Sequence, residues 1–209
     1  MSNDGPRTYF EIFSLPAKLV IDLPALEESF YALSRKLHPD RFAAKSLGEQ
    51  AAALAESSRL NDAYRTLKGP IARTEYLLKL EGVELEEQSK SATEAARATG
   101  TAKKQIVPED LLEEAFELNM QLEEMRMARK MGENDPQLRS DLLAAKAGFD
   151  ARMAATQSEL ETLWADWDQA LDASDAPAKA AARDAMVALL NRRSYLRNLV
   201  RDVNDALEV

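Results

Sequence analysis

The residues best suited to chemistry are His38 and Asp40, which flank Pro39 in the stretch from Leu37 to Phe42. A histidine and a carboxylate at this spacing could act as an acid–base pair, because imidazole gains and loses a proton near neutral pH. Such a pair also needs a nucleophile and donors for a developing charge, and the neighbouring sequence offers neither a candidate nucleophile nor a glycine-rich oxyanion motif. The sequence therefore gives little support to an acid–base enzyme that uses His38 and Asp40, which we keep as an alternative function.

Other catalytic and metal-binding patterns are missing from the sequence. A carboxylate-bridged di-iron site needs Glu-x-x-His pairs on facing helices, but the chain has one histidine, which lacks that spacing. The absence of cysteine rules out thiolate metal sites, a cysteine nucleophile and disulfides. The glycine patterns of nucleotide-binding loops and of hydrolase nucleophile elbows do not occur. We therefore expect no metal, no cofactor and no enzymatic activity.

The composition predicts an all-α protein. Of the 209 residues 45% are hydrophobic, many of them alanine, while seven glycines and eight prolines are too few for a turn-rich β protein. No apolar run approaches the roughly 20 residues that a membrane span requires, and the N-terminus lacks an apolar signal region. We expect a cytoplasmic protein without a membrane partner.

Charge divides unevenly along the chain. Up to Leu80 there are 11 Lys and Arg against 10 Asp and Glu, whereas from Glu81 onward there are 16 against 26. The two halves are therefore expected to meet different partners. A run of arginines lies within the acidic half: Arg192, Arg193, Arg197 and Arg201. Nucleic-acid binding normally requires a net basic surface, so we expect these arginines to pair with neighbouring carboxylates.

Helical patterns precede and follow the His38 turn. After a short helix at Tyr9 to Phe13, Asp22 and Pro24 mark the start of a helix that runs to the turn. Its apolar face has helical spacing: Leu26, Phe30, Leu33 and Leu37. A second long helix, from about Glu49 to Lys68, follows a loop of roughly 10 residues, which permits an antiparallel hairpin. A short helix to Leu80 closes this unit.

Cations surround the turn at the expected tip of the hairpin. They are Arg35, Lys36, Arg41 and Lys45. One interpretation is a solvated helix end, where cations interact favourably with the helix dipole. The other is a basic docking surface for a partner.

The acidic half predicts three helices behind a polar linker at about residues 84–105. They are expected from about Pro108 to Met131, Gln137 to Leu171 and Ala178 to Leu207, separated by Gly, Asp and Pro breakers. A three-helix bundle is the simplest arrangement.

The first helix of this bundle has two apolar faces. The stripe that would suffice to bury the helix is Leu111, Ala115, Leu118, Leu122 and Met125. The second, on roughly the opposite side, is Leu112, Phe116, Met120 and Met127, bordered by Glu113, Glu117 and Glu124. An exposed apolar strip beside carboxylates is typical of a protein-binding surface, although packing on the unit at residues 8–80 is the alternative. Tyr195, off the stripe of its own helix, is either exposed near this second stripe or covers the linker.

The order of these motifs resembles a J-domain. The resemblance rests on Tyr9-Phe10, the basic helix with His38-Pro39-Asp40, the run Leu60-Asn-Asp-Ala-Tyr-Arg-Thr-Leu67, Pro70, and Arg73 through Leu78. With an acidic helical unit behind it, the whole chain resembles the bacterial HscB-type co-chaperones of iron–sulfur cluster assembly. The domains implied are a J-domain at 8–82, a flexible linker at 83–106 and a three-helix scaffold-binding domain at 107–207.

We expect a monomer, and the resemblance implies two partners. One is a DnaK-type chaperone ATPase, HscA, contacted by His38, Pro39, Asp40, Arg35, Lys36 and Arg41. The other is an IscU-type scaffold protein, contacted by Leu112, Glu113, Phe116, Glu117, Met120 and Glu124, with Tyr195 nearby. A general J-protein with other clients is the alternative within the same class of function.

Overall fold

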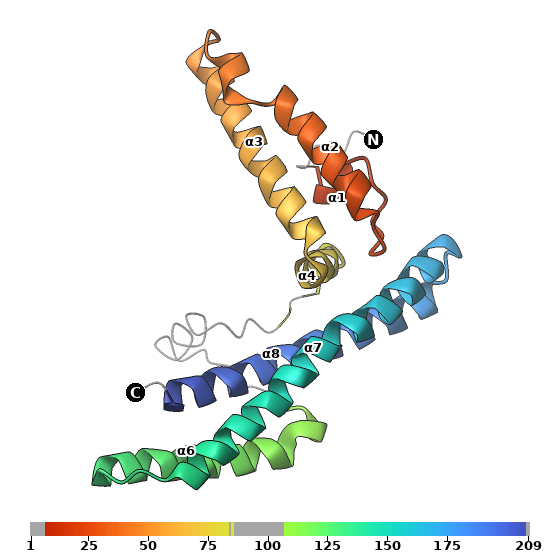
Figure 1. Cartoon of the computed structure of the whole chain (residues 1–209). Coiled ribbons are helices and arrows are strands. Elements are labelled where there is room, and N and C mark those ends of the chain that lie inside the picture. Colours follow the sequence, from red (N-terminus) through yellow and green to blue (C-terminus); the bar gives the residue numbers. More distant parts are fainter. Residues whose placement is uncertain (1–6, 84, 86–106, 208–209) are drawn as a thin grey trace. The chain divides into compact units, whose positions relative to one another are not determined.

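The computed structural model describes residues 7–83, 85 and 107–207, and Figure 1 shows their helices. These residues contain helices and no β-strand, which confirms the all-α prediction. The chain divides into two compact units: Met1–Glu84 with Glu161–Arg183, and Leu85–Leu160 with Asp184–Val209. Apart from Val83 and Leu85, the predicted linker lies outside the described residues. The predicted domain boundaries therefore stay a prediction.

Unit 1 begins with short and long helices that follow the sequence signals. They are α1 (Tyr9–Ile12), α2 (Leu23–Lys36), the 3₁₀ helix η1 (Pro39–Phe42), α3 (Leu47–Lys68) and α4 (Pro70–Leu80). Asp22 caps α2 by accepting a hydrogen bond from the N–H of Ala25, as expected for aspartate at a helix start. Ser46 and Glu49 form a reciprocal capping box at the start of α3, two residues before the predicted boundary.

Helices α2 and α3 pack together as the predicted hairpin (Figure 1). The rings of Phe30 and Tyr64 stack with their centroids 4.2 Å apart, and the Tyr64 hydroxyl donates to Glu27 at 2.9 Å. Leu26 is the fully buried member of the α2 stripe, and Leu37, next to the turn, is only half-buried. The apolar residues of α2 are therefore less buried next to the turn than at the other end of the helix.

The flanking helices close this unit. The backbone N–H of Tyr9 donates to the Tyr76 hydroxyl at 2.9 Å, and the two rings stack at 4.4 Å. Phe10 and Leu77 are buried in the same unit. The pairing of Tyr9 with Tyr76 explains how the chain's first helix, only four residues long, is held in place.

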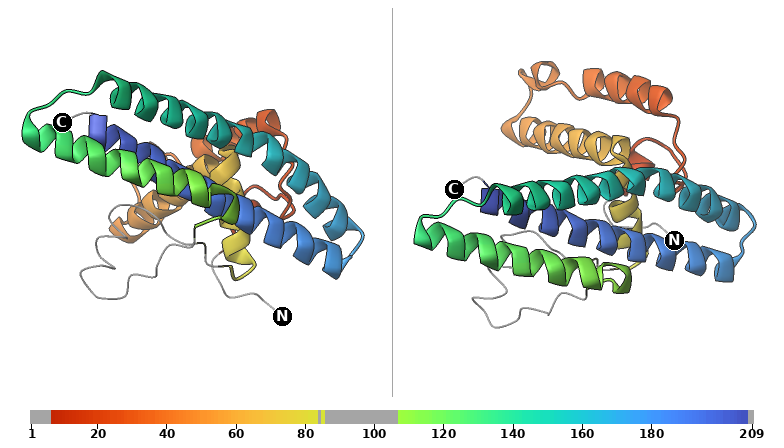
Figure 2. Two further views of the ribbon diagram at one scale, coloured as in Figure 1. Left: turned by 90° about the horizontal axis from the view of Figure 1, so that it is seen from below. Right: turned by 60° about the horizontal axis from the view of Figure 1, so that its bottom comes forward.

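Unit 2 contains most of the acidic half. Its elements are η2 (Glu109–Leu111), α6 (Leu112–Met131) and the larger parts of α7 (Pro136–Asp172) and α8 (Ala176–Leu207). Figure 2 shows the three long helices lying alongside one another. Their shared core draws on all three, including Leu118, Leu142, Phe149, Leu196 and Val203. The predicted three-helix bundle is confirmed, and none of the described helices has the length and apolarity to cross a membrane.

Candidate functional site

The turn after α2 is built by His38 and Asp40. The N–H of Asp40 donates to His38 Nδ1 at 3.3 Å, which makes the histidine side chain the cap of η1. The same nitrogen lies 3.4 Å from Asp40 Oδ2. In the neutral ring an accepting Nδ1 leaves the proton on Nε2. Pro39 begins η1 with its fixed φ, and its side chain lies outside what the structure describes.

Both ionisable side chains of this turn, His38 and Asp40, are open to solvent. The His38 side chain is 58% exposed and that of Asp40 is 88% exposed. Contacts between side chains this exposed contribute at most about 1 kcal/mol. Water also weakens the preorganised electrostatics on which enzyme catalysis depends. The geometry therefore suits contact with another macromolecule better than acid–base chemistry.

The predicted basic residues lie beside the turn. Arg35, Lys36 and Arg41 are exposed, and Arg41 Nη1 donates to the carbonyl oxygen of Arg35 at 3.4 Å. We call Arg35, Lys36, His38, Asp40 and Arg41 the turn surface. Sequence reasoning missed Tyr31, an exposed aromatic side chain one helical turn before Arg35. Its only signal was its position next to Phe30, off the apolar stripe.

The second predicted surface lies on α6. The four residues Leu112, Phe116, Met120 and Met127, which we call the exposed strip, keep 57% to 67% of their surface accessible. On the opposite side of α6 the predicted stripe is buried, from Leu111 through Met125. The predicted separation of these two faces is confirmed, and an exposed apolar strip of this kind is typical of a binding surface.

Carboxylates line one border of the exposed strip. Glu113, Glu117 and Glu124, which we call the acid row, are all exposed. At about 100° per residue these three positions project to nearly the same side of the helix. A partner that covers the exposed strip would therefore meet negative charge on one side, which favours a basic rim around an apolar patch.

Of the two placements predicted for Tyr195, exposure near the second stripe is wrong. Tyr195 is 7% exposed and belongs to the core of unit 2, together with Leu196 and Leu199. Burial is the main cause that raises the pKa of its hydroxyl above the ordinary value. The side chain is therefore a packing residue, and its place among the scaffold-binding residues loses its structural support.

Two arginines of the α8 run pair with carboxylates as predicted, whereas Arg197 donates to the hydroxyl oxygen of Ser194 at 3.1 Å. Arg192 pairs with Asp110 at 2.7 Å and Arg201 pairs with Asp202 at 3.1 Å. Both of these cations are therefore balanced by carboxylates of the same unit. Among the described residues, no group of three or more histidine, cysteine or carboxylate side chains could hold a metal ion.

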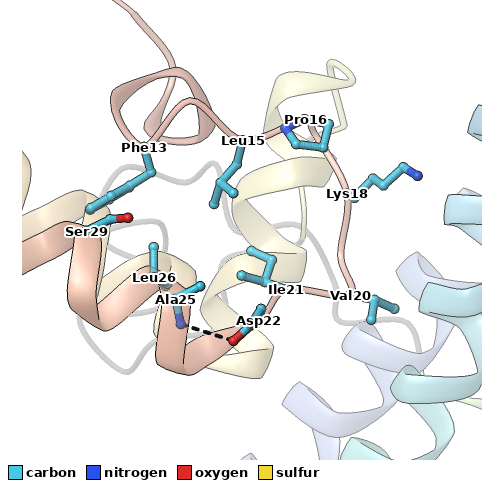
Figure 3. A pocket seen from close by; sticks show the side chains of 10 residues that line it. All are labelled: Phe13, Leu15, Pro16, Lys18, Val20, Ile21, Asp22, Ala25, Leu26 and Ser29. Carbon is cyan, nitrogen blue, oxygen red and sulfur yellow. Dashed lines mark hydrogen bonds between the residues drawn. The ribbon is translucent and has the colours of Figure 1, made fainter.

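A small pocket of about 140 Å³ lies between α2 and the segment that precedes it (Figure 3). Phe13, Leu15, Ile21 and Leu26 point toward one another, which makes its wall mainly apolar. Its charged residues have structural contacts: Asp22 caps α2, and Lys18 pairs with Asp172 at 2.7 Å. This pocket therefore offers no free acid or base for catalysis.

Comparison with known proteins bears on both surfaces together. No protein-family model matches the chain. Among solved structures, the chaperone HscB from Vibrio cholerae is 27% identical, with 96% of this chain and 99% of that chain covered and a TM-score of 0.51. The human co-chaperone protein HscB is 20% identical, with 100% and 87% covered and a TM-score of 0.59. The chain has an HscB-type fold. The human likeness is too distant in sequence to show more than the fold.

The HscB-type fold gives the two surfaces a common context. The match extends over nearly the whole chain and nearly the whole of the bacterial HscB, so it includes both the turn surface and the exposed strip. This breadth supports a co-chaperone role and favours a protein that acts through contacts with other proteins over an enzyme.

Proposed function

We propose that this protein is a cytoplasmic, monomeric co-chaperone of iron–sulfur cluster assembly that acts on two partners. The turn surface binds a DnaK-type chaperone, HscA, and stimulates its ATP hydrolysis. The exposed strip and the acid row bind an IscU-type scaffold protein and deliver it to that chaperone. In this proposal residues 8–82 are the J-domain, 83–106 the linker and 107–207 the scaffold-binding domain.

The observation that carries the first half is the exposure of the His38–Asp40 pair at the turn of the α2–α3 hairpin. A carboxylate that caps nothing buried is free to accept a charge-assisted bond from a partner's arginine. The surrounding cations Arg35, Lys36 and Arg41 provide electrostatic steering toward an acidic surface. Tyr31 adds an exposed aromatic ring of the kind enriched at interfaces.

The exposure of apolar side chains on α6 supports the second half. Four large apolar residues facing solvent on a helix whose opposite face is already buried are not needed for the fold. Methionine at two of the four positions gives an adaptable surface, which also fits the alternative of a general J-protein with several clients.

Asp40→Asn tests the proposal, because it removes the charge of an exposed side chain without touching the core. We expect the variant to retain its helical content and scaffold binding while losing stimulation of the chaperone's ATP turnover. Asp62→Asn, at an exposed carboxylate in the middle of α3, is the matched control and should stimulate normally. Normal stimulation by Asp40→Asn would contradict the assignment of the turn surface.

A further inference from the structure

A groove of about 440 Å³ lies between α6 and α7 in unit 2. Its lining includes the small residues Ala144, Ala145 and Gly148 on α7 and the apolar side chain of Leu118 on α6. This volume falls in the range of about 300–1,000 Å³ that is common for ligand pockets. The groove is therefore large enough to take protruding side chains of a partner.

The packing around position 148 leaves room for a residue larger than glycine. Gly148 lies inside helix α7, where glycine costs about 0.5–1 kcal/mol relative to alanine. A Cβ atom placed on Gly148 would meet no other atom within 4 Å, so neither backbone conformation nor a close neighbour demands glycine there. The missing side chain keeps the groove open down to the helix backbone.

The rim of the groove has an excess of negative charge. Glu114 is neutralised by Arg152, which donates two hydrogen bonds of 2.6 Å to its carboxylate. Within the described part of the chain, Glu117 has no hydrogen bond or ion pair, and Asp141 is bonded only to the neutral amide of Gln137 at 2.9 Å. Two carboxylates at the mouth of an apolar groove thus have no cation from the described residues.

The groove adjoins the exposed strip through the acid row. Glu117 belongs to both the acid row and the groove lining, and Phe116 of the strip is its neighbour in the chain. Around the circumference of α6, the exposed strip is followed by the acid row and then by Glu114 and Gln121, which line the groove. A partner seated on the strip with its basic rim over the acid row therefore reaches the groove without interruption.

We propose that this groove binds a basic segment of the same scaffold protein that covers the exposed strip. The aliphatic stem of a lysine or arginine lies over Ala144, Ala145 and Gly148, and its cationic head pairs with Glu117 and Asp141. A long basic side chain fits both halves of the site, because its stem is apolar while its head is charged. The inference rests on the proposed function for its partner and extends that interface from α6 to α7.

Gly148→Leu is the direct test, because leucine favours helix and fills the groove from its floor without a clash at Cβ. Binding of a purified IscU-type scaffold protein is measured by calorimetry at several salt concentrations. We expect Gly148→Leu to weaken binding by about tenfold or more, which corresponds to about 1.4 kcal/mol. Ala147→Leu, at an exposed residue outside the groove lining of the same helix, should bind like the unchanged protein.

Asp141→Asn tests the basic occupant separately, since it keeps the shape of the groove and removes one charge. We expect weaker binding and a shallower dependence of affinity on salt. Unchanged affinity in Gly148→Leu, with its helical content intact, would overturn the groove. A loss in Gly148→Leu without any change in Asp141→Asn would overturn the basic occupant.

The same titrations separate this inference from the function on which it rests. If Phe116→Ala weakens binding while Gly148→Leu and Asp141→Asn do not, the scaffold-binding function stands and the groove proposal fails. If the unchanged protein binds no scaffold, both fail.

Discussion

Trp164 donates its indole N–H to the hydroxyl oxygen of Thr74 at 2.9 Å, joining two buried side chains 90 residues apart in the chain. The Thr74 hydroxyl in turn donates to the carbonyl of Pro70 at 2.9 Å. Arg73 lies over the Trp164 ring, 4.6 Å from its centroid, and donates to the carbonyl of Leu67 at 2.6 Å. Burial lowers the pKa of Arg73, but the guanidinium stays charged. Directional contacts therefore tie the last turns of α7 to α4 within unit 1.

Replacing Thr74 with valine is expected to destabilise unit 1. Valine has the same shape but leaves the buried indole N–H without an acceptor, at a cost of about 1–3 kcal/mol in the free energy of unfolding. The measurement is denaturant unfolding followed by tryptophan fluorescence, since the chain's two tryptophans, Trp164 and Trp167, both lie in unit 1.

A double-mutant cycle isolates this hydrogen bond. Adding Trp164→Phe to Thr74→Val removes the orphaned donor. The double variant should therefore lose less unfolding free energy than the sum of the losses in the two single variants. Strict additivity would mean that the hydrogen bond contributes nothing to stability.

Asp168 is expected to be a stronger determinant of the same unit. Its two carboxylate oxygens accept hydrogen bonds from the backbone N–H groups of Leu19 and Val20 at 2.9 and 3.0 Å. The variant Asp168→Asn would keep one acceptor oxygen and turn an NH₂ group toward the other N–H. We expect this substitution to cost about 1.5–3 kcal/mol, the range for hydrogen bonds to charged groups.

Asp166→Asn is the control, because Asp166 lies exposed on the same helix. It should unfold like the unchanged protein under the same denaturant conditions. Equal stability of the two variants would show that the Asp168 contacts are not worth more than a surface charge.

The pairing of Asp168 with Leu19 also marks a limit of sequence reasoning. The two residues are 149 positions apart, and no local pattern signals that a carboxylate in a helix caps a distant loop. The two faces of α6 were predictable because helical spacing alone separates Leu118 from Phe116. The turn surface was predictable for a similar reason, since its residues are neighbours in the sequence. Local features of the sequence thus predicted both candidate surfaces, by periodicity on α6 and by adjacency at the turn.

Tyr195 shows where periodicity failed. The sequence predicts one apolar stripe on this helix, which includes Leu196 and Val203, but α8 also contributes Tyr195 and Leu199 to the core of unit 2. A helix with neighbours on more than one side buries more than one row of side chains. The number of neighbouring helices is a tertiary property, so the sequence of α8 alone could not show whether the side chain of Tyr195 is buried or exposed.

The capping box of α3 predicts a pH dependence. Glu49 accepts hydrogen bonds from the side chain and backbone N–H of Ser46, and these bonds hold the pKa of Glu49 below its usual 4.5. A lowered folded-state pKa contributes stability above the ordinary pKa, and this contribution is lost as pH falls through the folded value. Glu49→Gln should therefore be less stable than the unchanged protein near neutral pH, and the difference should shrink below the ordinary pKa.

Thermal unfolding of both proteins across this acid range measures the effect. Glu28→Gln, at an exposed residue of α2, serves as the control and should follow the unchanged protein at every pH. A stability difference for Glu49→Gln that stays constant down to the lowest pH would contradict the charged cap.

Phe116 and Phe149 separate binding from folding within unit 2. Phe116 belongs to the exposed strip, whereas Phe149 lies in the core, so their replacement by alanine should have opposite consequences. Phe149→Ala is expected to lose about 3–5 kcal/mol of unfolding free energy. Phe116→Ala combined with Met120→Ala should stay within about 0.5 kcal/mol per site, as is usual for surface positions. Far-ultraviolet circular dichroism is the appropriate probe, because unit 2 contains no tryptophan.

Scaffold binding by the same double variant tests the role of the exposed strip. If the exposed strip is the binding surface, removing its central aromatic ring should cost about 1 kcal/mol or more of binding free energy, as for an interface anchor. A large loss of stability in this variant would mean that the strip is part of the core. Normal stability with normal affinity would leave exposed apolar surface without a partner on α6, and the scaffold would have to bind elsewhere. Lower affinity for the scaffold with unchanged stability is the result that identifies the exposed strip as a binding surface.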